Sequence, residues 1–153
     1  IKSPSPILID VGAHVGEYTA LFKSRFPSAA VYCFEPSQAH FNLLVEATKK
    51  LDGVHLSRAA LGKQEGEETL YADQAVSGLA SLTKRRLQHY AISMELKETV
   101  PVTTLDRFVR EHDIGAIDLL KIDVEGHELD VLEGAKETLA AGRIGVVQFE
   151  FGG

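Results

Sequence analysis

The segment with the most evident chemistry lies at residues 7–16, where an apolar run is followed by Asp10, Gly12 and Gly16. This order predicts a buried strand that enters a tight glycine loop, with a helix beginning near Glu17. Glycine lets a backbone approach a ligand closely because it has no Cβ atom, and the start of the helix offers unpaired N–H groups. The carboxylate of Asp10 would repel a pyrophosphate and attract an ammonium group.

A second apolar run, at residues 30–35, ends in Glu35, nineteen residues after Gly16. At the carboxyl edge of a parallel sheet, such an acid commonly binds a ribose, and its two oxygens can accept hydrogen bonds from both hydroxyl groups. The glycine spacing differs from the dinucleotide fingerprint G-x-G-x-x-G. A ligand with an amino acid at one end and a nucleoside at the other fits both strand ends, and S-adenosylmethionine is such a ligand.

A third group of reactive side chains lies at residues 119–128. Lys121 and Asp123 alternate along an apolar strand and therefore share one face of it, while Glu125 and His127 follow near the start of the next helix. Ligands of open α/β sheets bind at this edge, so the last three of these residues are candidates for a general base, with Lys121 as an orienting group. Helix capping by the acids is the alternative explanation. The same residue types ligate metals, but no H-x-x-x-H pair or Cys cluster supports a metal site, and we expect none.

The hydrophobic pattern predicts an α/β fold, namely a Rossmann-like, doubly wound and mostly parallel sheet with helices on both faces. Strands are expected near 7–11, 30–35, 54–58, 68–72, 98–103, 117–122 and 145–151. Helices are expected near 16–25, 37–50, 104–112 and 127–141, with Ser37 as an N-cap. In the last helix, Leu129, Leu132, Ala135 and Leu139 should form the buried face. Residues 1–6 are a lead-in, residues 7–153 form a single domain, and residues 62–100 are an irregular insertion or edge hairpin within it.

The composition of the chain limits which partners and which cellular compartment we expect. The chain has 153 residues, a net charge of -6 and one short basic cluster at residues 84–86, which we interpret as a solvated helix end, so no nucleic-acid footprint is visible. No apolar run approaches the roughly 18 residues of a membrane span, and no signal peptide is visible. The single cysteine, Cys33, excludes an internal disulfide and indicates a reducing compartment, so we expect a cytoplasmic protein.

Five blocks of sequence carry a resemblance to a known family. They are D-V-G-A-H-V-G at 10–16, F-E-P-S at 34–37, A-A-L-G at 59–62, T-L-D at 104–106 and L-K-I-D-V-E-G-H-E at 120–128. In this order they resemble the FkbM family of S-adenosylmethionine-dependent methyltransferases. The resemblance implies methyl transfer, usually to a hydroxyl oxygen of a sugar or natural product. The cofactor would then be bound by Asp10, Gly12, His14, Gly16, Glu35, Pro36, Ser37 and Ala60. The family usually has Asn at position 14, and a neutral imidazole can supply one hydrogen bond of that amide.

Members of that family continue beyond the position of Gly153 with another helix and a closing antiparallel pair of strands. We therefore expect this sequence to be truncated at its C-terminus. Without those residues one sheet edge would be exposed, which invites pairing of two copies into a homodimer. Two alternatives stay open. One is a nucleoside-binding module without turnover, and the other is an NAD(P)-dependent oxidoreductase, which the missing third glycine disfavours. Methylation of nucleic acid is disfavoured because the chain lacks a basic face and an Asn/Asp-Pro-Pro-aromatic loop.

Overall fold

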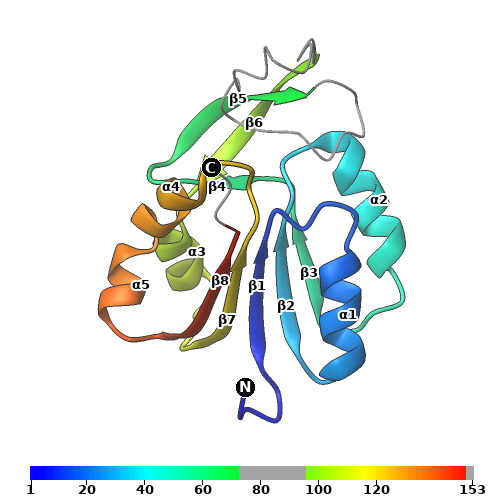
Figure 1. Cartoon of the computed structure of the whole chain (residues 1–153), viewed down its shortest axis with the longest axis vertical. Helices are drawn as coiled ribbons and strands as arrows, with labels where there is room; N and C mark the ends of the chain where they lie inside the picture. The colour runs from blue at the N-terminus through cyan, green and yellow to red at the C-terminus, as the bar shows by residue number, and fades with distance from the viewer. Residues whose placement is uncertain (73–95, 151–153) are drawn as a thin grey trace.

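The computed structural model of the chain describes residues 1–72 and 96–150. Its centre is a five-stranded parallel sheet with the order β3-β2-β1-β7-β8 (Figure 1). The strands are β1 (Ile7–Val11), β2 (Ala30–Phe34), β3 (Val54–Ser57), β7 (Ile117–Ile122) and β8 (Ile144–Phe149). The chain winds outward from β1 to β3 on one side and from β7 to β8 on the other. The switch point therefore lies between β1 and β7, and ligands of such sheets bind outside the carboxyl ends of the strands there.

Helices cover both faces of this sheet. Along β1, Leu8 packs into a cluster with side chains of α1 (Glu17–Arg25) and α2 (Gln38–Thr48). Ile9 and Val11 point to the opposite face and pack with α3 (Leu105–Glu111) and α4 (Glu128–Glu133), next to α5 (Lys136–Ala140). Strands buried on both sides have no need for polar alternation, which explains the continuous apolar runs in the sequence. The predicted fold class is confirmed.

A smaller, three-stranded sheet with the order β4-β6-β5 lies across the carboxyl ends of the parallel strands (Figure 1). It consists of β4 (Ala60–Leu61), β5 (Gly66–Ala72) and β6 (Leu96–Thr103), and β5 pairs with β6 in antiparallel fashion. The strands expected near 68–72 and 98–103 are therefore present, whereas two-residue β4 was too short to predict. The rest of the expected insertion, residues 73–95 with the basic cluster at 84–86, lies outside the described residues.

The helix expected near 127–141 is wrong in one respect, because the chain forms two helices, α4 and α5, separated at Gly134. A Cβ atom on this glycine would lie 2.0 Å from the carbonyl oxygen of Gly62, and the Gly134 carbonyl accepts a hydrogen bond from the Asp106 N–H at 2.9 Å. The predicted buried face is mostly confirmed, because Ala135 is fully buried and Leu132 and Leu139 pack partly buried against the core. Leu129, however, is 68% exposed, whereas Val131, outside the predicted face, is fully buried.

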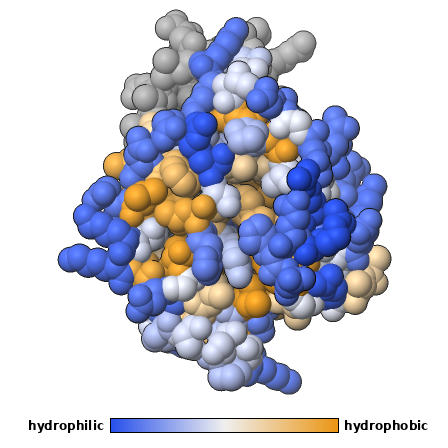
Figure 2. Space-filling view, turned by 180° about the vertical axis from the view of Figure 1, so that it is seen from behind, coloured by the Kyte–Doolittle hydropathy of each residue, from blue (hydrophilic) through white to orange (hydrophobic). Residues whose placement is uncertain are grey.

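The surface is mostly hydrophilic, but apolar side chains gather in patches on the face seen from behind (Figure 2). Large apolar side chains with substantial exposure include Leu21 on α1 and Val146 and Phe149 on the edge strand β8. None of the helices in the described part of the chain is long and apolar enough to cross a membrane.

Candidate active site

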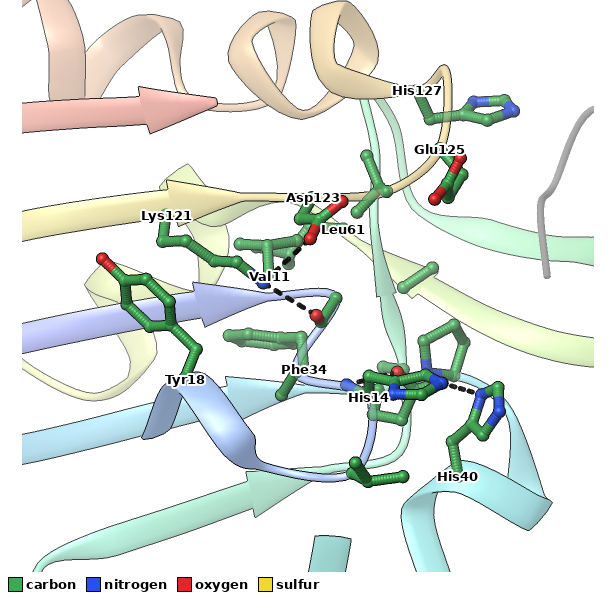
Figure 3. Close-up of a pocket in the computed structure, with 18 of the residues that line it drawn as sticks. Val11, His14, Tyr18, Phe34, His40, Leu61, Lys121, Asp123, Glu125 and His127 are labelled. Carbon is green, nitrogen blue, oxygen red and sulfur yellow. Dashed lines mark hydrogen bonds and ion pairs between the residues drawn. The ribbon is translucent and has the colours of Figure 1, made fainter. Parts of the chain in front are cut away.

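A cavity of about 310 Å³ opens at the carboxyl ends of β1, β2 and β7, where the small sheet covers the switch point. Nine of the residues predicted from the sequence line it: Gly12, His14, Glu35, Pro36, Ala60, Lys121, Asp123, Glu125 and His127. Asp10, Gly16 and Ser37 are not among its lining residues. The close-up in Figure 3 places Lys121 and Asp123 beside Val11, His14 beside His40, and Glu125 next to His127 at a third side.

The glycine loop follows β1 as predicted, but its glycines are required mainly by the protein itself. Gly12 has φ +77, and a Cβ atom there would lie 1.9 Å from the backbone oxygen of Asp123 at the end of β7. Gly16 has φ +87, and a Cβ atom there would lie 2.9 Å from Leu44 Cδ1 of α2. Both positions favour glycine because of this left-handed backbone. The loop is thereby packed against β7 and α2, and Gly12 also lines the cavity.

Asp10 lies beneath the cavity in a buried ion pair. Its carboxylate is fully buried, with Oδ2 accepting a hydrogen bond from Thr19 Oγ1 at 2.7 Å and Oδ1 lying 3.1 Å from Lys121 Nζ. The same ammonium group donates to the Gly12 carbonyl oxygen at 2.9 Å and lies 3.7 Å from Asp123 Oδ2. This burial does not fit direct contact between Asp10 and a ligand ammonium, so the attraction expected from the sequence would act at a distance. Lys121 instead fixes the glycine loop, and Asp123, whose side chain is 42% exposed, presents its charge to the cavity.

Glu35 follows β2 and is only 5% exposed, yet it borders the cavity. Its Oε2 accepts a hydrogen bond from the His14 N–H and its Oε1 from the Ser37 N–H, each at 2.9 Å. Burial raises the pKa of Glu35 to about 7, against the opposing effect of these two hydrogen bonds. A carboxylate oxygen can accept more than one hydrogen bond, so both oxygens retain capacity for a ligand. Ser37 also caps α2 as predicted, because its side chain accepts from the His40 N–H.

Two residues around the cavity were missed by the sequence analysis. His40 is 2% exposed, with Nδ1 3.8 Å from Glu35 Oε1 and its ring centroid 4.0 Å from that of His14. Tyr18 of α1 donates a hydrogen bond to Gln148 Oε1 at 2.7 Å, and its ring lies 5.5 Å from Lys121 Nζ (Figure 3). Neither residue belongs to a motif or a spacing pattern. Only the packing of α1 and α2 beside the glycine loop brings them to the site.

The third side of the cavity is formed by the turn from β7 into α4. Glu125 has φ 54 and Gly126 has φ 104, so two consecutive left-handed residues reverse the chain there. Such a conformation is costly for a residue other than glycine, and strained positions of this kind cluster at functional sites. His127 follows, with its Nδ1 3.1 Å from Asp130 Oδ2. Within residues 1–72 and 96–150, no three His, Cys, Asp or Glu side chains are grouped so that they could hold a metal ion.

The fold and the site together define an α/β protein with a cavity at its switch point, bordered by the buried carboxylate of Glu35. A model of the methyltransferase FkbM domain matches residues 10–153, so the chain belongs to the FkbM methyltransferase family. This confirms the family indicated by the five sequence blocks.

Individual relatives agree with this assignment. The 2-O-methyltransferase NoeI of Sinorhizobium fredii is 28% identical over 94% of this chain and 63% of its own length. The hexuronic acid methyltransferase AglP of Haloferax volcanii is 26% identical over 95% of this chain and 56% of its own length. The crystal structure of methyltransferase FkbM from Methylobacillus flagellatus has a TM-score of 0.61 at 17% identity, covering 92% of this chain and 32% of that one, which supports the fold. The chain thus spans about 60% of the length of these two curated relatives.

Proposed function

We propose that this protein is an S-adenosylmethionine-dependent methyltransferase that methylates a hydroxyl oxygen of a sugar or natural product. The names of NoeI and AglP, a 2-O-methyltransferase and a hexuronic acid methyltransferase, support this acceptor class. The observation that carries the proposal is Glu35, a buried carboxylate held by two backbone N–H groups on the wall of a cavity at the switch point. A carboxylate positioned in this way suits the two hydroxyl groups of a ribose.

The donor groups around the cavity fit this cofactor. Glu35 would bind the ribose, with Pro36 and Ala60 as apolar neighbours, and the loop from Gly12 to His14 would meet the amino acid end. The charge of Asp123 would attract a cationic ligand, because the ammonium of Lys121 is shared with Asp10. Asp10, Gly16 and Ser37 would act indirectly, through Lys121, α2 and Glu35 respectively. A volume of about 310 Å³ lies at the lower end of the usual range for small-molecule pockets.

The chemistry that follows from this assignment depends on position and on a base. When bound, the cofactor supplies a methyl group on a positively charged sulfur. The residues of the chain would hold donor and acceptor in line, which is worth roughly 7–11 kcal/mol in favourable cases. Of the three candidate bases we favour His127, which would take the hydroxyl proton at Nε2, because Asp123 is committed to Lys121 and to the ligand charge. A base at this point contributes about 10²–10⁴-fold.

Two further expectations belong to the same proposal. A cytoplasmic location is supported by the single cysteine, Cys33, which is buried and has no partner for a disulfide in the sequence. A homodimer is supported by the edge strand β8, whose Val146 and Phe149 side chains are about half exposed. Apolar patches and unpaired strand edges are surfaces that association covers.

Calorimetric titration with S-adenosylhomocysteine tests the proposal directly. We expect binding to the wild-type protein, strong weakening in Glu35→Ala, and little change in the control Glu46→Ala, which alters an exposed residue on the same side of the sheet. Transfer of labelled methyl groups to pooled sugars and hydroxylated natural products then tests turnover. Binding without transfer would favour the nucleoside-binding module, and preference for NADH would favour the oxidoreductase. Absence of S-adenosylhomocysteine binding would overturn the proposal.

A further inference from the structure

The aspartate Asp130 lies behind the candidate base His127, three residues further along the chain. Asp130 Oδ2 is 3.1 Å from His127 Nδ1, and the two side chains are 31% and 13% exposed. Figure 3 shows the His127 ring next to Glu125, at the side of the cavity that is away from His14. We propose that Asp130 is a positioning residue that holds His127 in the tautomer able to accept the proton of the acceptor hydroxyl. The catalytic role of this pair, but not the pairing itself, rests on the proposed function.

The pair is built on a rigid element. The His127 carbonyl oxygen accepts the Val131 N–H at 3.1 Å, and the Asp130 carbonyl oxygen accepts the Gly134 N–H at 3.0 Å. These are the hydrogen bonds of a helical turn, in which side chains three positions apart face each other. Val131 anchors the turn because it is fully buried in the core. The distance between Asp130 and His127 is therefore set by the helix rather than by two mobile loops, as a functional pair requires.

The second oxygen of Asp130 is also engaged. Lys63, in the connection between β4 and β5, has its Nζ 3.6 Å from Asp130 Oδ1. The carboxylate is thus held from two sides, by an imidazole on one oxygen and by an ammonium on the other. Lys63 itself is 54% exposed, so its ion pair contributes little to stability.

The chemical consequence concerns which ring nitrogen carries the proton. A neutral imidazole has one N–H donor and one acceptor nitrogen, and a carboxylate at Nδ1 selects the form with hydrogen on Nδ1. Nε2 then carries the lone pair that a base needs. When the acceptor oxygen bonds to the methyl carbon, the bond from that carbon to the cofactor sulfur would break, and the electron pair would stay on the neutral thioether that leaves. The hydroxyl proton would move to Nε2, and the carboxylate of Asp130 would stabilise the imidazolium without taking the proton. Among the described residues, the charged groups near this ring include Asp130, Lys63 behind it, and Glu125 and Asp123 on the preceding turn.

The tautomer of His127 can be measured without any turnover. Long-range ¹H–¹⁵N spectra of the labelled, ligand-free protein should show hydrogen on Nδ1 in the wild type at pH 8. In Asp130→Asn this preference should be lost, whereas Glu133→Gln, on the same helix, should leave it unchanged. Hydrogen on Nε2 in the wild type, or an unchanged tautomer in Asp130→Asn, would overturn the inference.

Kinetics then test whether the pair works as a unit. Asp130→Asn should lower kcat about 10- to 100-fold, shift the rising limb of the pH–rate profile, and leave S-adenosylhomocysteine affinity within about twofold. In a His127→Ala background the same substitution should cost less than about twofold. An equal loss in both backgrounds, or a matching loss of ligand affinity, would show that Asp130 acts elsewhere. If the wild type binds S-adenosylhomocysteine but methylates no acceptor, the proposed function fails. The tautomer spectra still decide whether Asp130 sets the tautomer of His127.

Discussion

Under the proposed function, ligand binding by this chain should depend on pH, because the ribose would be bound by Glu35, a carboxylate whose ionisation is costly. Burial raises the pKa of Glu35 from its ordinary value of 4.5 to about 7. Ribose hydroxyl groups donate hydrogen bonds, so they favour the ionised form of Glu35 over the protonated form. Binding should therefore weaken as the pH falls through 7, and the ligand should in turn lower the pKa of this carboxyl group.

The size of the effect follows from the fraction of Glu35 that is ionised in the ligand-free protein. With a pKa of about 7, roughly nine-tenths is ionised at pH 8 and about one-tenth at pH 6. The affinity for S-adenosylhomocysteine should consequently fall about tenfold between these pH values, or about 1.4 kcal/mol. At pH 7, about half a proton should be released for each ligand bound.

The assay is calorimetry at pH 6, 7 and 8 in buffers of different ionisation enthalpy, which reports affinity and proton release together. In Glu35→Gln, affinity should be lower throughout and its pH dependence should be lost. The nearest imidazoles are those of His40, with Nδ1 3.8 Å from Glu35 Oε1, and of His14, whose ring centroid lies 4.0 Å from that of His40. A pH dependence that survives in Glu35→Gln but disappears in His40→Gln would assign the effect to the imidazoles and refute the reasoning.

The raised pKa of Glu35 also makes the stability of the ligand-free protein depend on pH. Ligand affinity should rise with pH, whereas this stability should fall. Since the folded pKa of Glu35 lies above its value of 4.5 in the unfolded chain, the folded ligand-free protein binds the proton more tightly. Its stability should therefore fall as the pH rises from about 4.5 to about 7, by up to about 3 kcal/mol in total. The thermal shift produced by S-adenosylhomocysteine should accordingly be larger at pH 8 than at pH 6.

Three further predictions concern the elements that hold the site. Gly12→Ala should cost about 2–5 kcal/mol in urea unfolding because its Cβ would overlap a carbonyl oxygen, whereas Gly115→Ala, with nothing within 4 Å, should be nearly neutral. Lys121→Met should cost about 3–5 kcal/mol by leaving Asp10 buried without its partner, and adding Asp10→Asn should recover part of that loss; a loss that simply adds would disprove the coupling. Burial raises the pKa of the Cys33 thiol to about 12, so its labelling at pH 8 should require unfolding and follow the unfolding rate; rapid labelling of the native protein would contradict this.

Much of the architecture follows from local pattern. The apolar runs that became β1, β2 and β7 are continuous because these strands are buried on both faces, and this pattern is readable without any structure. The start of α2 was also predictable, since Ser37 is an N-cap whose side chain bonds a backbone N–H within the same turn. Asp10, Glu35 and Asp123 stand at or just after the ends of predicted strands. This placement was enough to predict the edge of the sheet at which the cavity lies.

The features of the fold and of the site that could not be predicted depend on contacts between segments far apart in the sequence. Gly134 breaks the last predicted helix because it packs against the Gly62 carbonyl, a residue 72 positions earlier. His40 and Tyr18 reach the cavity through the packing of their helices, which no local spacing encodes. The ion pair of Lys121 with Asp10 could not be predicted for the same reason. The sequence places it on one face with Asp123, but only the pairing of β7 with β1 puts it opposite Asp10.

That pairing bears on the kind of ligand that the proposed site would prefer. Among the described residues that line the cavity, the acids are Glu17, Glu35, Asp123 and Glu125, and the residue with a permanent positive charge is Lys121. The ammonium of Lys121 lies 3.1 Å from the buried carboxylate of Asp10, so its charge is largely compensated from below. A diphosphate would then face several carboxylates without a matching cation, whereas a ligand with a sulfonium and an ammonium group would be attracted. The charge balance around β1 and β7 therefore supports a cationic nucleoside over a dinucleotide, independently of the glycine spacing.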